Sequence, residues 1–139
     1  AHYFFDYNEI WVPPSFSFKN DNDLAILVHE ATHAHMDYKK VGVVRRDWAE
    51  AIGYLAEAYW RRCWSLPPVS SDLVRVEAMR VASGLHAGTY KVPPADVAEL
   101  RRLLIPVAQR FGFCAEVMAR GVGGATALEI KNRRPTVQR

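Results

Sequence analysis

The pattern of apolar and polar positions predicts a short β-hairpin followed by four helices. Residues 2–18 are rich in aromatic and β-branched side chains, and the polar stretch 6–9 suits a turn between two strands. Pro13 and Pro14 end the second strand, since neither can donate a ladder hydrogen bond. Such a strand either covers the core or accepts an extended peptide at its free edge, and the sequence favours neither.

Capping residues at 20–23 mark the start of the first helix, just before Leu24. At about 100° per residue, this helix separates into two stripes. The stripe predicted to face the core comprises Leu24, Leu27, Val28, Ala31, Ala34, His35 and Tyr38. The stripe predicted to carry the chemistry comprises Ile26, His29, Glu30, His33 and Asp37. His35 is thus expected in the core or in support of the site, not as a ligand.

A second helix is predicted from Trp48 to Trp64, and its residues also separate into a core stripe and a polar stripe. Its predicted core stripe comprises Trp48, Ile52, Leu55, Ala56, Tyr59 and Cys63. Its predicted polar stripe comprises Glu50, Tyr54, Glu57 and Arg61.

Prolines separate the later helices. The stretch 66–68, which contains two prolines, interrupts the helical pattern. Ser70 and Ser71 follow it, and either can cap a third helix that reaches to about Leu85. Two prolines at 93–94 open a fourth helix.

The fourth helix is predicted to be kinked by Pro106 and capped by Gly112, and residues 113–120 add one short helix. No internal repeat or domain boundary is visible. The prediction is one mainly α (α+β) domain over residues 1–139, with a small N-terminal hairpin.

Composition adds few constraints. Half of the residues are apolar, and the net charge of +3 owes much to Lys131–Arg139, which is predicted to be a flexible tail. Without interleaved aromatic residues, nucleic-acid binding by this tail is not expected. Cys63 and Cys114 are far apart and are predicted to be buried free thiols. No run is long enough to span a bilayer, and a start at Ala1 suggests a piece of a larger protein, so its location stays unknown.

The clearest chemical signal is the H-E-x-x-H pattern of His29, Glu30 and His33. On a helix, histidines four residues apart share one face, where both imidazoles reach a single metal ion. Zinc held in this way keeps room for a third protein ligand and a water molecule. Glu30 stands beside the metal, placed to take a proton from that water.

A glutamate on the second helix is the expected third ligand, and Glu50 and Glu57 are the candidates. Glu57 has a partner at i,i+4 in Arg61, whereas Tyr54 occupies the equivalent position after Glu50. Glu50 is therefore preferred.

Three residues are candidates to stabilise an oxyanion by donating a hydrogen bond: Tyr54, His86 and Tyr90. His86 and Tyr90 lie just past the third helix and qualify only if the fold returns them to the metal. Asp37, one turn after His33, either orients an imidazole or a basic neighbour or is an ordinary solvated aspartate.

The stretch L-A-I-L-V-H-E-A-T-H-A-H-M-D, followed by W-A-E-A-I-G-Y-L-A-E-A-Y, resembles the zincin metallopeptidases. It is most similar to small gluzincin-type domains of bacterial secreted effectors and polymorphic toxins, which show H-E-x-T-H-A-x-Q-D and then E-A-x-A-Y. The matching positions are His29, Glu30, Thr32, His33, Ala34, Asp37, Glu50, Ala51 and Tyr54. The chain departs at Met36, where glutamine is usual, and at Gly53, where alanine is usual and where the change is expected to loosen helix packing.

The resemblance covers residues 1–60 and implies a zincin-like domain with its hairpin edge above the cleft for substrate. It implies Zn²⁺ bound by His29, His33 and Glu50, with Glu30 as general base for peptide hydrolysis. It also implies a peptide or protein substrate, secretion within a larger effector, and a cognate inhibitor or immunity protein as a partner. The alternative is a non-proteolytic zinc-binding pseudoenzyme or interaction module on the same fold.

Overall fold

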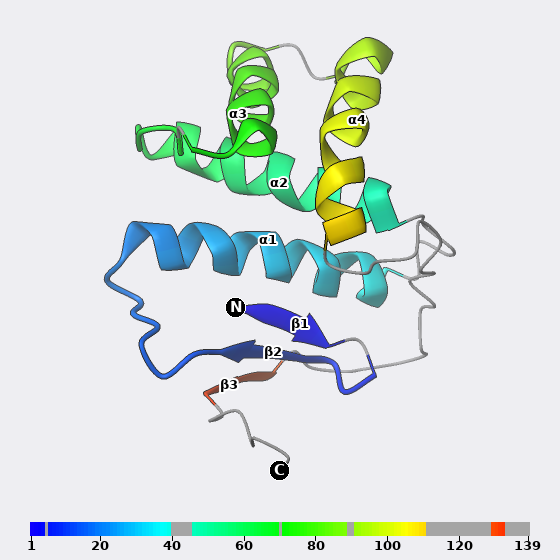
Figure 1. Cartoon of the computed structure of the whole chain (residues 1–139). Helices are drawn as coiled ribbons and strands as arrows, with labels where there is room; N and C mark the ends of the chain where they lie inside the picture. The colour runs from blue at the N-terminus through cyan, green and yellow to red at the C-terminus, as the bar shows by residue number, and fades with distance from the viewer. Residues whose placement is uncertain (5, 40–45, 70, 89–90, 111–128, 133–139) are drawn as a thin grey trace.

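The computed structural model describes residues 1–4, 6–39, 46–69, 71–88, 91–110 and 129–132. It is mainly helical, with the small N-terminal antiparallel hairpin that the sequence predicts. The elements, in chain order, are β1 (His2–Phe4), β2 (Glu9–Val12), α1 (Asp21–Tyr38), α2 (Arg46–Cys63), α3 (Leu73–His86), α4 (Pro94–Arg110) and β3 (Glu129–Asn132). Helix α1 lies between the sheet and α2, and α3 and α4 stand on the far side of α2 (Figure 1).

The sheet has the order β1-β2-β3. Strands β1 and β2 are antiparallel, with Tyr3 opposite Ile10, while β3 runs parallel to β2, with Ile130 beside Ile10. Lys131 thus lies in a strand, and the prediction of a flexible tail from this residue onward is wrong for 131–132. Residues 133–139 lie outside the described part of the chain. Sheet pairing between distant segments leaves no local sequence signal, which explains the error.

Helix α1 begins where its capping residues predict. The side-chain oxygen of Asn20 accepts hydrogen bonds from the backbone N–H groups of Asn22 and Asp23, at 2.9 and 3.4 Å. This N-cap satisfies two donors that the first turn of a helix leaves without backbone partners.

The two stripes of α1 are both covered. One side packs on the sheet, where Ala34, Leu27 and Ala31 meet Tyr3, Ile10 and Val12. On the side toward α2, His29 is only 6% exposed, and Glu30, which bonds the backbone of Tyr3, is only 9% exposed, so these two residues of the stripe with the chemistry are also buried. His35 and Tyr38, by contrast, are exposed, and their predicted place in the core is wrong. They lie in the last turn, past the layers that cover the middle of the helix.

Helix α2 buries part of the face predicted to be polar and exposes part of the predicted core stripe, of which Leu55 does pack against the core. Glu57 and Arg61, assigned to the polar stripe, are buried, whereas the predicted core residues Trp48, Ile52 and Tyr59 are exposed. Periodicity separates two stripes but does not state which one faces inward. Here the small residues of α2 fill the interior between the helices, while Arg75 of α3 and Asn22 of α1 provide polar partners for its buried Glu57 and Arg61.

The core between α2, α3 and α4 is built from small and branched side chains. Its buried members are Ala51, Ala58, Val74, Ala78, Val81, Ala82, Leu100 and Leu104. Cys63 is a free thiol on the exposed face of α2. The prediction that it is buried is therefore wrong. Cys114 lies outside the described residues.

Helix α3 is capped by Asp72, not by Ser70 or Ser71. Its carboxylate accepts hydrogen bonds from the backbone N–H groups of Val74 and Arg75, at 2.9 and 3.4 Å. Helix α4 begins at Pro94 as predicted and continues through Pro106 to Arg110. The Gly112 cap and the helix over 113–120 lie outside the described residues.

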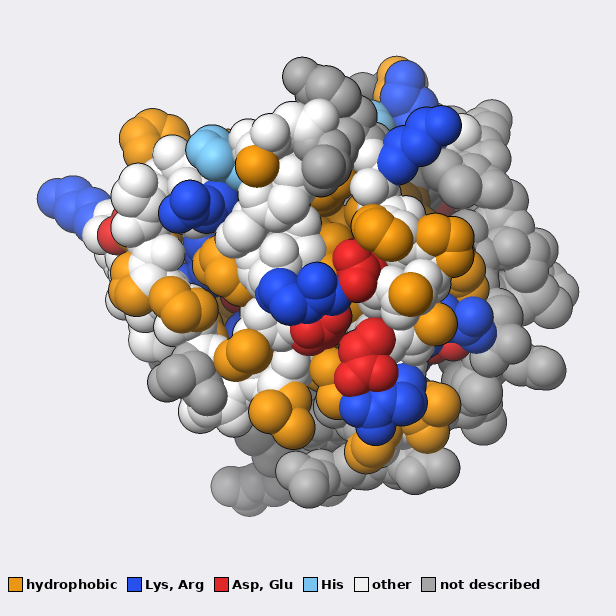
Figure 2. All heavy atoms as spheres, turned by 90° about the horizontal axis from the view of Figure 1, so that it is seen from above, with side chains coloured by type: hydrophobic (Ala, Val, Ile, Leu, Met, Phe, Trp, Pro, Cys, Tyr) orange, Lys and Arg blue, Asp and Glu red, His pale blue; other side chains and the backbone are white. Residues whose placement is uncertain are grey.

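An ion pair joins α3 and α4 at their surface. Arg80 on α3 pairs with Glu77 of the same helix and with Asp96 of α4. Seen from above, acidic and basic side chains lie next to one another near the centre of this face, among hydrophobic side chains (Figure 2). Such exposed pairs contribute little stability each, so the helices are held chiefly by the apolar core. In the described part of the chain, no helix combines the length and apolar character needed to cross a membrane.

Candidate metal site

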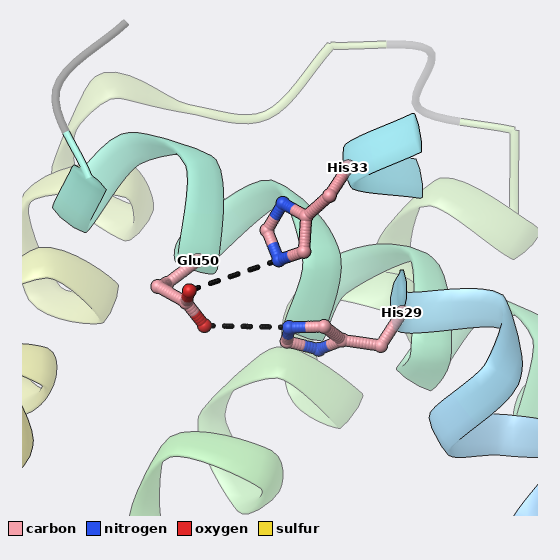
Figure 3. Close-up of side chains that lie close together, drawn as sticks. All are labelled: His29, His33 and Glu50. Atoms are coloured by element: carbon pink, nitrogen blue, oxygen red, sulfur yellow. Dashed lines mark ion pairs between the residues drawn. The ribbon is translucent and has the colours of Figure 1, made fainter. Parts of the chain in front are cut away.

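His29 and His33 of α1 and Glu50 of α2 point toward one another (Figure 3). Each offers one ligand atom, and these atoms all lie within 4.8 Å of one another. Nε2 of His29 is 3.3 Å from Oε2 of Glu50, and Nε2 of His33 is 3.7 Å from Oε1. The structure thus brings together the two histidines of the motif with Glu50, the preferred third ligand.

The electrostatics of the site favour the ligand forms of these groups. Burial, together with the charge of His29, lowers the pKa of His33 to about 4. Burial of Glu50 acts to raise its pKa, but the hydrogen bond from His29 and the charge of His33 outweigh burial, so its pKa is lowered. At neutral pH His33 therefore has a free lone pair and Glu50 is ionised, as metal binding requires.

Glu30 lies on α1 beside His29, with its carboxylate held by the first strand. The backbone N–H of Tyr3 donates to Oε2 of Glu30 at 2.8 Å. Burial raises the pKa of Glu30, although the charge of His29 and the Tyr3 hydrogen bond act to lower it. The charge of Glu50 acts to raise the pKa of Glu30 as well, so the carboxylate lies within electrostatic range of two of the candidate ligands, His29 and Glu50.

Gly53 allows α2 to approach the ring of His29. A Cβ atom at this position would lie 2.7 Å from Nε2 and 2.8 Å from Cε1 of His29, well inside van der Waals contact. The sequence predicts that Gly53 loosens the helix packing. Instead, the glycine allows close packing, because it makes room for the imidazole of His29.

Replacement of Gly53 by alanine is expected to displace the His29 ring and to lower zinc affinity by about 10-fold or more, as disturbed ligand orientation does. The same change favours the helix by roughly 1 kcal/mol. Competition with a chromophoric chelator measures the affinity, and thermal unfolding of the metal-free chain measures the stability.

Gly88 provides the matched control for this prediction. It has φ +103 and nothing within 4 Å of an added Cβ, so Gly88→Ala strains the backbone without touching the site. The control is expected to lower stability and to keep zinc affinity. A Gly53→Ala chain with unaltered zinc affinity would contradict the steric argument.

Tyr54 lies beside the candidate ligands. Its ring packs edge-on against the His29 ring, with centroids 4.7 Å apart, and the guanidinium of Arg75 lies 5.0 Å from its centroid. Burial raises the pKa of Tyr54 to about 12, so at neutral pH the phenol keeps its proton and can donate a hydrogen bond.

His86 is not brought to the site. It ends α3, where its Nδ1 lies 3.9 Å from Sγ of Cys63. Cys63 is about 20 Å farther along α2 than Glu50, at 1.5 Å per residue. The fold therefore does not meet the condition for an oxyanion donor at His86, and Tyr90 lies outside the described residues.

Asp37 and Glu57, the two remaining candidate carboxylates, do not belong to the group of candidate metal ligands. Asp37 does not orient an imidazole in this structure but accepts a hydrogen bond from the hydroxyl of Tyr3 at 2.6 Å. Glu57 pairs with Arg61 as predicted, at 3.3 Å, and its other oxygen lies 3.9 Å from Nδ1 of His29, behind the candidate ligands. Oε2 of Glu57 therefore faces Nδ1 of His29, whereas Glu50 faces Nε2 of the same ring.

Two groups near the site escape prediction from the sequence. The N–H of Tyr3 is a backbone group, which no residue type reveals. Arg75 comes from α3 and donates to Glu57 at 3.0 Å, a contact that only the tertiary fold creates.

Comparison with known protein families, with curated proteins and with solved structures finds no match for this chain. The chemistry of the site is therefore the basis for the proposed function.

Proposed function

We propose that this chain is a zinc-dependent peptidase, with zinc held by His29, His33 and Glu50 and with Glu30 as general base. The observation that supports it is the convergence of two imidazoles and one carboxylate from adjacent helices within 4.8 Å. A buried carboxylate of raised pKa stands beside them on α1.

The donor set fits zinc. Two imidazoles and one carboxylate are common zinc ligands, and three protein donors leave a coordination position for water, as in catalytic sites. When bound, zinc lowers the pKa of water toward neutrality and polarises a carbonyl group.

The chain's own residues supply the proton transfers and the hydrogen bonds of this proposal. Glu30 accepts a proton from the attacking water and gives it to the leaving amine. Its raised pKa makes the carboxylate a stronger base than an exposed glutamate. The hydroxyl of Tyr54, which keeps its proton at neutral pH, donates to the oxyanion that develops on the carbonyl.

The substrate class follows from the resemblance of residues 1–60 to zincin domains. We expect a peptide or protein substrate, a place within a larger secreted effector or toxin, and a cognate inhibitor protein. Strand β1 has only three residues, and the N–H of Tyr3 is already bonded to Glu30, so strand addition at this edge has little to offer a substrate.

One observation favours the alternative, a non-proteolytic zinc module. The Tyr3 hydrogen bond engages Oε2 of Glu30, and an engaged carboxylate is less available as a base.

Both functions are tested with the full chain, stripped of metal by a chelator and reloaded with zinc. Metal analysis counts the bound ions, and mass spectrometry detects cleavage of a diverse peptide mixture. One zinc per chain with zinc-dependent cleavage supports the peptidase. Zinc bound at the same residues without cleavage supports the module, and no zinc binding contradicts both.

A further inference from the structure

Glu57 is a charged side chain in the interior of the helical layers, only 1% exposed. A buried carboxylate costs free energy unless charged or polar partners surround it. Its Oε1 accepts hydrogen bonds from Nε of Arg61 at 3.3 Å and from Nε of Arg75 at 3.0 Å. One oxygen thus binds both guanidinium groups and fixes the orientation of the carboxylate.

These arginines are anchored in turn. Arg61 donates to Asn22 of α1 at 2.9 Å, and Arg75 donates to Asp72 at the start of α3 at 2.6 Å. The position of the Glu57 carboxylate is therefore determined by the helices on both sides of α2.

The second oxygen of Glu57, Oε2, is buried and has no hydrogen-bond partner among the described residues. It lies 3.9 Å from Nδ1 of His29, about 1 Å beyond hydrogen-bond distance. Buried acceptors are nearly always paired in proteins. An N–H group on Nδ1 of His29 is the donor that this geometry suits.

The two ring nitrogens of His29 face different carboxylates. Nε2 lies 3.3 Å from Glu50, at the candidate ligands, and Nδ1 faces Glu57. A neutral imidazole has one proton, so a lone pair on Nε2 requires the proton to be on Nδ1. A carboxylate that accepts this proton fixes the tautomer and the ring orientation of a metal-binding histidine.

We infer that Glu57 is the positioning residue of the metal site: Oε2 holds the Nδ1 proton of His29 and so keeps the Nε2 lone pair free for metal. This inference rests on the proposed function. It gives Glu57, the less favoured candidate for third ligand, a role behind the ligands. It also explains why a charged group with two arginine partners lies buried here.

Glu57→Gln tests the inference because it keeps the shape of the side chain. Both guanidinium groups require an acceptor and will bind the amide oxygen, so the amide nitrogen faces Nδ1 of His29. Nδ1 must then accept a hydrogen bond, and the ring proton moves to Nε2, the ligand atom. Competition with a chromophoric chelator is expected to show zinc affinity about 10- to 100-fold lower.

Asp72→Asn is the matched control. It weakens the same network at Arg75 and keeps a good N-cap residue for α3, but it leaves the atom that faces His29 unchanged. It is expected to bind zinc with the affinity of the unaltered chain. A Glu57→Gln chain that folds and binds zinc equally well overturns the inference.

A second measurement does not depend on how the variant folds. Nitrogen–proton correlation spectra of the unaltered chain, zinc-free and zinc-loaded at slightly alkaline pH, identify the protonated nitrogen of His29. The expected result is a slowly exchanging proton on Nδ1 in both samples, and an Nδ1 that has no proton or that binds the metal overturns the inference. If the chain binds no zinc, the proposed function fails, and the zinc-free spectrum still decides the role of Glu57.

Discussion

Replacement of Glu30 by glutamine is expected to abolish peptide cleavage while the chain still binds zinc. General-base catalysis by a positioned side chain contributes about 100- to 10,000-fold, and the rate is expected to fall by a factor in this range. The amide oxygen of glutamine still accepts the hydrogen bond from Tyr3, which is 2.8 Å long in the parent chain, so the local fold is preserved. Zinc analysis and kcat/KM on a cleaved peptide measure the two effects separately.

Glu99→Gln is the control for the loss of a carboxylate, because Glu99 is a surface residue that pairs with Arg102 on α4. It is expected to leave both zinc content and kcat/KM unchanged. If Glu30→Gln cleaves at the parent rate, the base is another group and the assignment of Glu30 is wrong.

The loss of a candidate ligand is expected to have the largest effect on metal binding. Structural zinc sites with four ligands bind with about 10–16 kcal/mol, or roughly 2.5–4 kcal/mol per ligand. His33→Ala is therefore expected to lower zinc affinity by about 100- to 1,000-fold, measured by chelator competition. His35→Ala removes a histidine two residues away that is exposed, and it is expected to change nothing.

Glu50→Ala extends the test to the second helix. Its zinc affinity is expected to fall about as far as that of His33→Ala, because its oxygens lie 3.3 and 3.7 Å from the two imidazoles. Unaltered affinity in Glu50→Ala would show that the third ligand is another residue, and the proposed site would need revision.

Features that depend on neighbouring residues could be predicted from the sequence. The start of α1 follows from the cap at Asn20, whose side chain bonds N–H groups two and three residues away. The facing histidines follow from their spacing on one helix. The hairpin turn before Glu9 is similarly local, because it joins strands that are adjacent in the chain.

Features that depend on packing could not be predicted. The buried face of α2 is decided by its neighbours: Arg61 is buried because Asn22 and Glu57 accept its hydrogen bonds, while Trp48 is left outside. The choice between Glu50 and Glu57 is of the same kind. Both lie on one stripe of α2, but Glu50 meets two imidazoles at the open side and Glu57 lies behind His29 between two arginines.

In the proposed peptidase, the hydrogen bond between Tyr3 and Glu30 would couple the general base to the first strand. A single amide proton cannot serve the carboxylate and an incoming ligand at once. In the proposed peptidase, a Glu30 carboxylate that turns toward water would leave this amide proton free for another acceptor. The availability of the base would then depend on the hydrogen bonding of the amino-terminal strand.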